Sequence, residues 1–212
     1  MKTFKQFVTP ATQMSRVVRG EFPDRQFDVD FWQQQGDVAI FKAAWEMVET
    51  TEAFKGTNLE LKPDFKDFLR LLNHNKVKYL IVGGYAVMKY TEPFYTKDLD
   101  IWIESTSENA NRTYRTLVEF GAPMADLTVH DLTQPHIVFQ FGNAPLRIDV
   151  ITSIDGVVSF GEAWDDRVQT QLGNIPISII SIQHLKQNKQ TANRDSDRIH
   201  LARLEKYGHD PS

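Results

Sequence analysis

The chain contains no cysteine in its 212 residues. This excludes disulfide bonds, thiolate metal sites and cysteine nucleophiles, and is typical of proteins from a reducing compartment. No apolar run is long enough to cross a bilayer, and the opening segment MKTFKQFVTP has no apolar stretch behind its lysines. We therefore predict a cytoplasmic protein with no signal peptide and no membrane association.

A surplus of positive charge is also missing, because the formal net charge is -4 at pH 7. A large nucleic-acid footprint needs a positive field, so this balance argues against one, although 24 Lys and Arg residues leave room for a local basic patch. Hydrophobic residues make up 41% of the chain, which is sufficient for an ordinary globular core. The length suits one domain, or one domain with an appendage.

Residues 1–60 differ in pattern from the rest of the chain. Within 37–54, apolar residues recur about four positions apart, as they do on one face of a helix. We predict an N-terminal helical arm over 1–60, followed by a domain over 61–212. The apolar stripe of the arm is expected to pack on the core or on a second copy, as in a homodimer. Its residues are Ile40, Phe41, Ala44, Trp45 and Val48.

The remainder of the chain alternates between helical and extended patterns. Apolar spacing predicts helices over 63–75, 85–90, 108–120 and 182–206, the last one interrupted near Asn193. Strands are predicted over 77–82, 99–103, 137–141, 146–151 and 175–180, with a hairpin at 142–145. This order predicts an α/β (α+β) fold: a mixed β-sheet with helices on one face and a helical C-terminal region.

Carboxylates on two of these strands are the strongest functional signal. Asp98 and Asp100 are two residues apart on a strand, so their side chains lie on the same face. Such a pair repels unless a cation lies between the two groups, and hard oxygen ligands suit Mg²⁺ or Mn²⁺. Asp149, on a later strand, supplies a third carboxylate. An Asp-x-Asp pair alone is more often a solvated surface pair, but the combination with Asp149 favours a metal site.

Gly83 and Gly84 separate a strand from a short helix. Without a Cβ atom, backbone N–H groups can approach a phosphate closely, and the start of a helix adds a favourable dipole. A double glycine alone is usually only a turn. Here it precedes the Asp-x-Asp strand, which favours a phosphate-binding role.

The segments VGGYAV (82–87) and TKDLDI (96–101), with the later Asp149, resemble the DNA polymerase β-type nucleotidyltransferase superfamily. The likeness is to small bacterial domains of the abortive-infection toxin and minimal nucleotidyltransferase kind, and it extends over about 64–204. It implies a nucleotidyltransferase core that transfers a nucleoside monophosphate from an NTP to a hydroxyl. The three aspartates would hold two Mg²⁺ or Mn²⁺ ions and activate that hydroxyl. The triphosphate would be held by Gly83, Gly84, Thr96, Lys97 and Lys189.

The chain departs from the family pattern at Phe94, where a basic residue is common, at Asn193, where glycine is usual, and at His200, where a second acid is expected. The acceptor stays open between a tRNA 3′ end, a protein side chain and a small antibiotic. The resemblance is compatible with a toxin–antitoxin or phage-defence context that includes a partner protein. The alternative interpretation is a catalytically silent domain, antitoxin-like, that binds a nucleotide or a partner.

Overall fold

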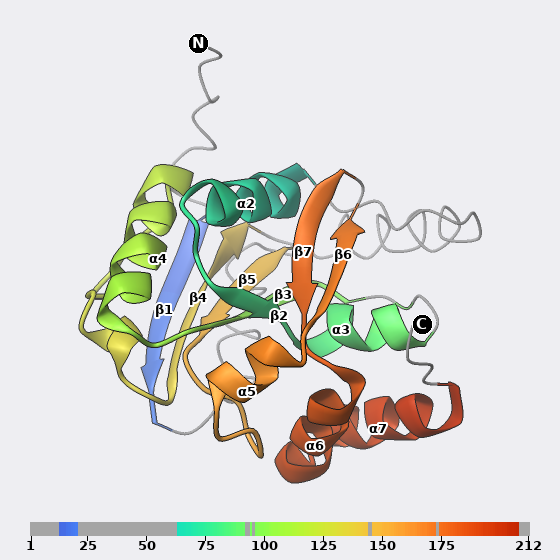
Figure 1. The fold of residues 1–212 in the computed structure, drawn as a ribbon. Coiled ribbons are helices and arrows are strands. Elements are labelled where there is room, and N and C mark those ends of the chain that lie inside the picture. Colours follow the sequence, from blue (N-terminus) through green and yellow to red (C-terminus); the bar gives the residue numbers. More distant parts are fainter. Residues whose placement is uncertain are drawn as a thin grey trace, which may run out of the picture.

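A seven-stranded mixed β-sheet organises the part of the chain that this computed structural model describes, residues 13–20, 63–91, 94, 96–143, 146–172 and 174–207 (Figure 1). The strands are β1 (Gln13–Arg19), β2 (Tyr79–Ile81), β3 (Asp98–Ile103), β4 (Ile137–Asn143), β5 (Arg147–Ile151), β6 (Val168–Leu172) and β7 (Ile175–Ile179), in the spatial order β1-β4-β5-β3-β2-β7-β6. The helices are α2 (Pro63–His74), α3 (Gly83–Tyr90), α4 (Ser107–Phe120), α5 (Phe160–Asp165), α6 (Ile182–Ala192) and α7 (Asp195–Tyr207), with a 3₁₀ turn η1 (Asp131–Thr133). The predicted mixed α/β fold with a helical C-terminal region is confirmed.

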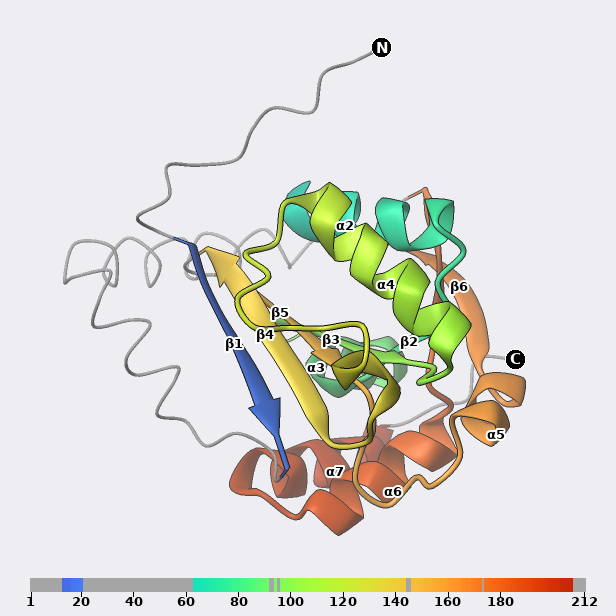
Figure 2. The same cartoon turned by 90° about the vertical axis from the view of Figure 1, so that its left-hand side faces the viewer.

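Helices α2 and α4 lie side by side over one face of the sheet (Figure 2). The Phe68 ring of α2 packs edge-on against Phe120 of α4 and Phe141 of β4, with centroid distances of 5.1 and 5.6 Å. Phe141 is the register partner of Ile148, which is the register partner of Leu99, so these side chains share one apolar face. The neighbouring positions on each strand point to the opposite face. The predicted carboxylates therefore lie on the side away from α2 and α4.

The second face of the sheet carries the short helix α3, which contacts β3 and the C-terminal pair α6 and α7. Ser181 caps α6 by accepting a hydrogen bond from the His184 backbone N–H. Asn193 ends this helix with φ 48° and ψ 30°. Asparagine tolerates this left-handed conformation, so its presence at the usual glycine position leaves the break between α6 and α7 intact.

Strand β1 is an element that the sequence did not predict. It pairs antiparallel with β4 along its whole length, from Gln13↔Asn143 to Arg19↔Ile137. Residues 13–19 are therefore part of the sheet, and assigning them to a helical arm was wrong. An edge strand is held by hydrogen bonds to a partner that lies far along the chain. Its own residues therefore need carry only a weak strand pattern. The apolar stripe within 37–54, and the homodimer predicted from it, lie outside the described residues.

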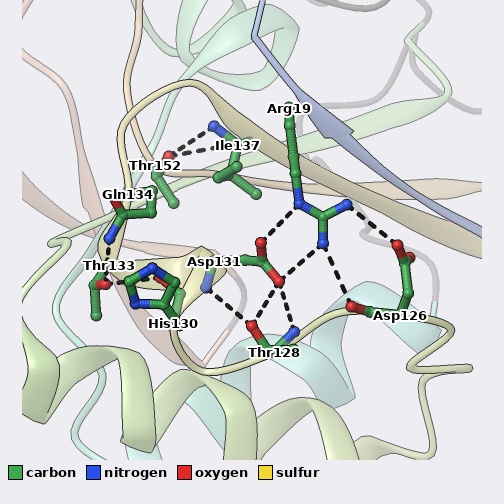
Figure 3. A network of polar contacts seen from close by, with 9 residues as sticks. All are labelled: Arg19, Asp126, Thr128, His130, Asp131, Thr133, Gln134, Ile137 and Thr152. Atoms are coloured by element: carbon green, nitrogen blue, oxygen red, sulfur yellow. Dashed lines mark hydrogen bonds and ion pairs between the residues drawn. The ribbon is translucent and has the colours of Figure 1, made fainter.

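The end of β1 is tied to the loop before β4 by a charged network (Figure 3). The Arg19 guanidinium donates to Asp131 Oδ1 at 2.7 Å and to Asp126 Oδ2 at 3.1 Å. Thr128 donates to Asp131 Oδ2 from its backbone N–H and its hydroxyl, at 2.9 and 2.7 Å. These donors hold the pKa of Asp131 well below its usual range, the Arg19 side chain contributing most. The network fixes β1 against the sheet.

None of the helices in the described part of the chain is long and apolar enough to cross a membrane.

Candidate active site

The three predicted aspartates come together on adjacent parallel strands. Asp100 of β3 is the register partner of Asp149 of β5, and Asp98 is the partner of Arg147. Because neighbouring strands lie about 4.8 Å apart, these side chains share one patch of the sheet face. The Asp149 side chain is completely buried, whereas Asp98 keeps 26% of its side chain exposed. The site thus combines one interior carboxylate with a partly open one.

Arg147 lies between two of these carboxylates. Its Nε donates to Asp149 Oδ1 at 2.7 Å, and its Nη2 donates to Asp149 Oδ2 at 3.1 Å and to Asp98 Oδ2 at 2.8 Å. Within the described residues, no three His, Cys, Asp or Glu side chains are grouped so that they could hold a metal ion as they stand. The Arg147 guanidinium thus neutralises part of the negative charge of Asp98 and Asp149 that a bound cation would otherwise neutralise.

The remaining electrostatics of the site still favour an added positive charge. Burial, with the charges of Asp149 and Asp100, raises the pKa of Asp98 to about 8. Burial and the charge of Asp149 raise the pKa of Asp100 to about 7, against the opposing charges of Lys189 and Arg194. Asp98 Oδ1 is buried and has no hydrogen-bond partner within the described residues. Carboxylates in this state are suited to a divalent cation.

The double glycine is required by the packing around Asp100. Gly83 has φ +61°, and a Cβ atom there would lie 1.8 Å from Asp100 Oδ2. A Cβ on Gly84 would lie 2.9 Å from Thr96 Oγ1. The Gly84 backbone N–H donates to the Asp100 carboxylate and lowers its pKa. The start of α3 therefore adjoins the carboxylates, with Thr96 next to it.

Two lysines predicted to contact phosphate lie within electrostatic reach of the aspartates. The charge of Lys97 lowers the pKa of Asp98, and the charge of Lys189 lowers that of Asp100. Lys189 is buried, and its Nζ donates to the equally buried Asp197 at 2.9 Å. This lysine therefore has a structural ion pair at the α6–α7 junction that the sequence did not predict.

Two of the departures from the family pattern contact each other. The Phe94 and His200 rings are 5.1 Å apart between centroids, and the Arg203 guanidinium lies 4.9 Å from the Phe94 ring. Burial, together with the charge of Lys189, lowers the pKa of His200 to about 4, so the ring is neutral at pH 7. The two rings therefore form one aromatic contact between the segment before β3 and helix α7.

Sequence reasoning missed two residues that approach the third aspartate. Gln140 of β4 donates from Nε2 to Asp149 Oδ2 at 2.9 Å, and Arg16 of β1 donates to Gln140 Oε1. The isolated glutamine between Phe139 and Phe141 is a signal for Gln140, because the predicted hairpin places that strand beside Asp149. No comparable signal identifies Arg16, which depends on the unpredicted strand β1.

Comparison with known proteins places residues 62–211 in the family described as "Nucleotidyl transferase of unknown function (DUF2204)". Among solved structures, the chain is similar to the lincosamide antibiotic adenylyltransferase LnuA, bound to lincomycin, at 15% identity and a TM-score of 0.46, covering 70% of this chain and 98% of that one. It is also similar to TM1012 of Thermotoga maritima, assigned as a nucleotidyltransferase, at 14% identity and a TM-score of 0.48, covering 69% and 96%. No curated protein matches the chain.

Proposed function

Because the chain belongs to the nucleotidyl transferase family DUF2204, we propose that it transfers a nucleoside monophosphate from an NTP to a hydroxyl acceptor. The observation that carries this proposal is the register of β3 and β5, which sets Asp100 beside Asp149 with Asp98 on the same face. Burying three carboxylates at one point of a sheet costs free energy unless a positive charge neutralises them. In metal-assisted phosphoryl transfer, a bound divalent cation supplies that positive charge.

Asp98, Asp100 and Asp149 would hold Mg²⁺ or Mn²⁺. The fit is supported by the unpartnered Asp98 Oδ1 and by the raised pKa values of Asp98 and Asp100. A bound divalent ion supplies Lewis-acid stabilisation of charge on the transferred phosphate and on pyrophosphate. Asp98 Oδ1 is available to such an ion, whereas Asp98 Oδ2 already accepts a hydrogen bond from Arg147.

The residues around the carboxylates support binding of the triphosphate. Gly83 and Gly84 begin α3 without side chains, so Asp100 and Thr96 can lie against the start of this helix, whose dipole favours a phosphate. Thr96 adjoins Gly84, and Lys97 adds a positive charge beside Asp98. Lys189 adds a second positive charge within reach of Asp100. These groups would orient the chain of phosphates along the carboxylate patch and neutralise its charge.

In the reaction, the acceptor oxygen forms a bond to the α-phosphorus, and the bond from that phosphorus to the leaving pyrophosphate oxygen breaks. The hydroxyl proton passes to a carboxylate of the site. Asp98 and Asp100 can accept it, because both side chains are partly exposed. No covalent enzyme intermediate is required. The acceptor is one of three classes: a tRNA 3′ end, a protein side chain or a small hydroxyl-bearing antibiotic. A partner toxin or antitoxin would define the biological context.

The test is incubation with Mg²⁺ and each NTP labelled at the α-phosphorus, with total tRNA, protein extract or a panel of small hydroxylated compounds. We expect label to appear in one acceptor class and pyrophosphate to be released. Asp100→Asn should abolish both signals, whereas Asp67→Asn, at a half-buried position of α2 that pairs with Arg70, should leave both unchanged. Equal label transfer by the wild type and Asp100→Asn would refute the proposal.

A second candidate function is nucleotide binding without turnover. The observation in its favour is that Arg147 already pairs with Asp98 and Asp149, so the site can exist with an internal cation. The same incubation separates the two functions. A silent domain would bind labelled NTP and yet release no pyrophosphate with any acceptor.

A further inference from the structure

A row of polar side chains crosses the sheet in register and ends at the candidate active site. Arg16 of β1 is the register partner of Gln140 of β4, Gln140 is the partner of Asp149 of β5, and Asp149 is the partner of Asp100 of β3. Register partners on adjacent strands point to the same face and lie within side-chain reach. The row therefore connects the edge strand to the carboxylates.

Gln140 is held in one orientation. Its side chain is almost fully buried at 2% exposure, so both ends of its amide need partners. Arg16 donates to Gln140 Oε1 from Nε at 3.2 Å and from Nη2 at 3.1 Å. A guanidinium has only donors, so the amide oxygen must face Arg16 and the amide nitrogen must face Asp149. A flipped amide would set its oxygen against the Asp149 carboxylate and its NH₂ group against the Arg16 guanidinium.

Within the residues that the structure describes, Gln140 is the only residue besides Arg147 whose side chain donates a hydrogen bond to the Asp149 carboxylate. Asp149 Oδ2 accepts from Gln140 Nε2 at 2.9 Å and from Arg147 Nη2 at 3.1 Å, while Oδ1 accepts from Arg147 Nε at 2.7 Å. Beside a bound cation the neutral amide can stay in place, because it carries no charge that competes with the ion. Gln140 would then keep the buried carboxylate oriented.

We propose that Gln140 and Arg16 are positioning residues for Asp149, so that strand β1 completes the active site. This inference rests on the proposed function. Strand β1 precedes residues 62–211, over which the family match extends. The segment that completes the site is thus a feature of this chain beyond the matched region.

A second arginine on the same strand provides a matched control. Arg19 donates hydrogen bonds to Asp126 and Asp131 at the far end of β1 (Figure 3), and neither of these residues belongs to the row of polar side chains. Replacing Arg19 removes a tie between β1 and the core. Replacing Arg16 also removes hydrogen bonds between β1 and the core, and these are the bonds that orient the Gln140 amide. The difference between the two variants isolates the effect on the site.

The experiment measures Mn²⁺ binding by the loss of the free-ion electron paramagnetic resonance signal, with melting temperature and label transfer recorded in parallel. The variants are Gln140→Met, Arg16→Met, the double variant and Arg19→Met. Loss of an outer hydrogen bond to a metal ligand lowers affinity by about 10- to 100-fold, so we expect that loss in Gln140→Met. Arg16→Met should lose part of it, the double variant no more than Gln140→Met alone, and Arg19→Met none despite a lower melting temperature.

The outcomes separate this inference from the proposed function. Mn²⁺ binding that Asp100→Asn abolishes, with unchanged affinity in Gln140→Met, would overturn the inference and leave the proposed function standing. Additive losses in the double variant, or equal affinities in Arg16→Met and Arg19→Met, would show that Arg16 does not act through Gln140. If Gln140→Met fails to fold, the comparison of Arg16→Met with Arg19→Met decides. A wild type with no Asp100-dependent Mn²⁺ binding would overturn both.

Discussion

Replacing Arg147 with Met would test how the carboxylate site tolerates its own charge. The substitution keeps an unbranched side chain of similar length but removes three hydrogen bonds, two to Asp149 and one to Asp98. Asp149 is completely buried and would keep only the hydrogen bond from Gln140 among the contacts described. The variant should therefore be less stable than the wild type in the absence of divalent ions.

The size of the loss follows from the burial of the pair. Removing one partner of a buried ion pair typically costs about 3–5 kcal/mol. The lower end applies here, because the Gln140 amide stays and Asp98 is partly exposed. For a chain of this length, a loss of about 3 kcal/mol corresponds to about 6–12 °C in melting temperature. If Mg²⁺ takes over the role of the lost guanidinium, a tenfold gain in ion affinity would return about 1.4 kcal/mol at high ion concentration.

The assay is urea denaturation of the wild type and Arg147→Met with EDTA and with millimolar Mg²⁺. Arg70→Met is the matched control: Arg70 pairs with Asp67 at 2.9 Å, but its side chain is 52% exposed, so about 0–1 kcal/mol is expected. The reasoning is refuted if Arg147→Met unfolds at the wild-type urea concentration. It is also refuted if Mg²⁺ stabilises the wild type and the variant equally.

Three further predictions concern other parts of the site and its support. Lys189→Ala should destabilise the fold by about 3 kcal/mol, measured by urea denaturation, because buried Asp197 loses its close ion pair and keeps only the more distant one with Arg194, at 3.8 Å. Gly83→Ala should abolish the rise in melting temperature caused by Mg²⁺ and NTP, because the new Cβ would overlap the Asp100 carboxylate. Asp131 should stabilise the fold above about pH 3.9, its unfolded pKa, and this stability should be lost as pH falls through its lowered folded pKa.

Each of these predictions has a control. Lys186→Ala lies on the same helix as Lys189 in a less buried position and should change stability by less than about 0.5 kcal/mol. Gly121→Ala also replaces a glycine at positive φ, 83°, but meets nothing within 4 Å, so it should lower stability without removing the response to Mg²⁺ and NTP. Asp131→Asn should flatten the acid limb of the stability curve, and an unchanged limb would contradict the role given to Asp131.

Local pattern was sufficient to predict most elements near the site. The period of two along a strand is a property of the backbone, so Asp98 and Asp100 share a face because the extended segment begins at Asp98. Residues such as Ser181, Gly121 and Asn193 mark helix ends through bonds with neighbours a few positions away. Such signals are carried by the residues themselves. Strand β6 has weak alternation at an exposed edge, and the sequence did not predict it.

The sequence by itself thus determined which residues could carry the chemistry, and the tertiary structure decided which of them meet. That Asp149 stands beside Asp100, with Arg147 bridging to Asp98, depends on the register of β3 against β5. That Lys189 pairs with Asp197 depends on how α6 packs on α7. The contribution of Arg16 depends on β1 pairing with a strand far along the chain. Register and packing are set by the burial of the whole core, so no local window of residues contains them.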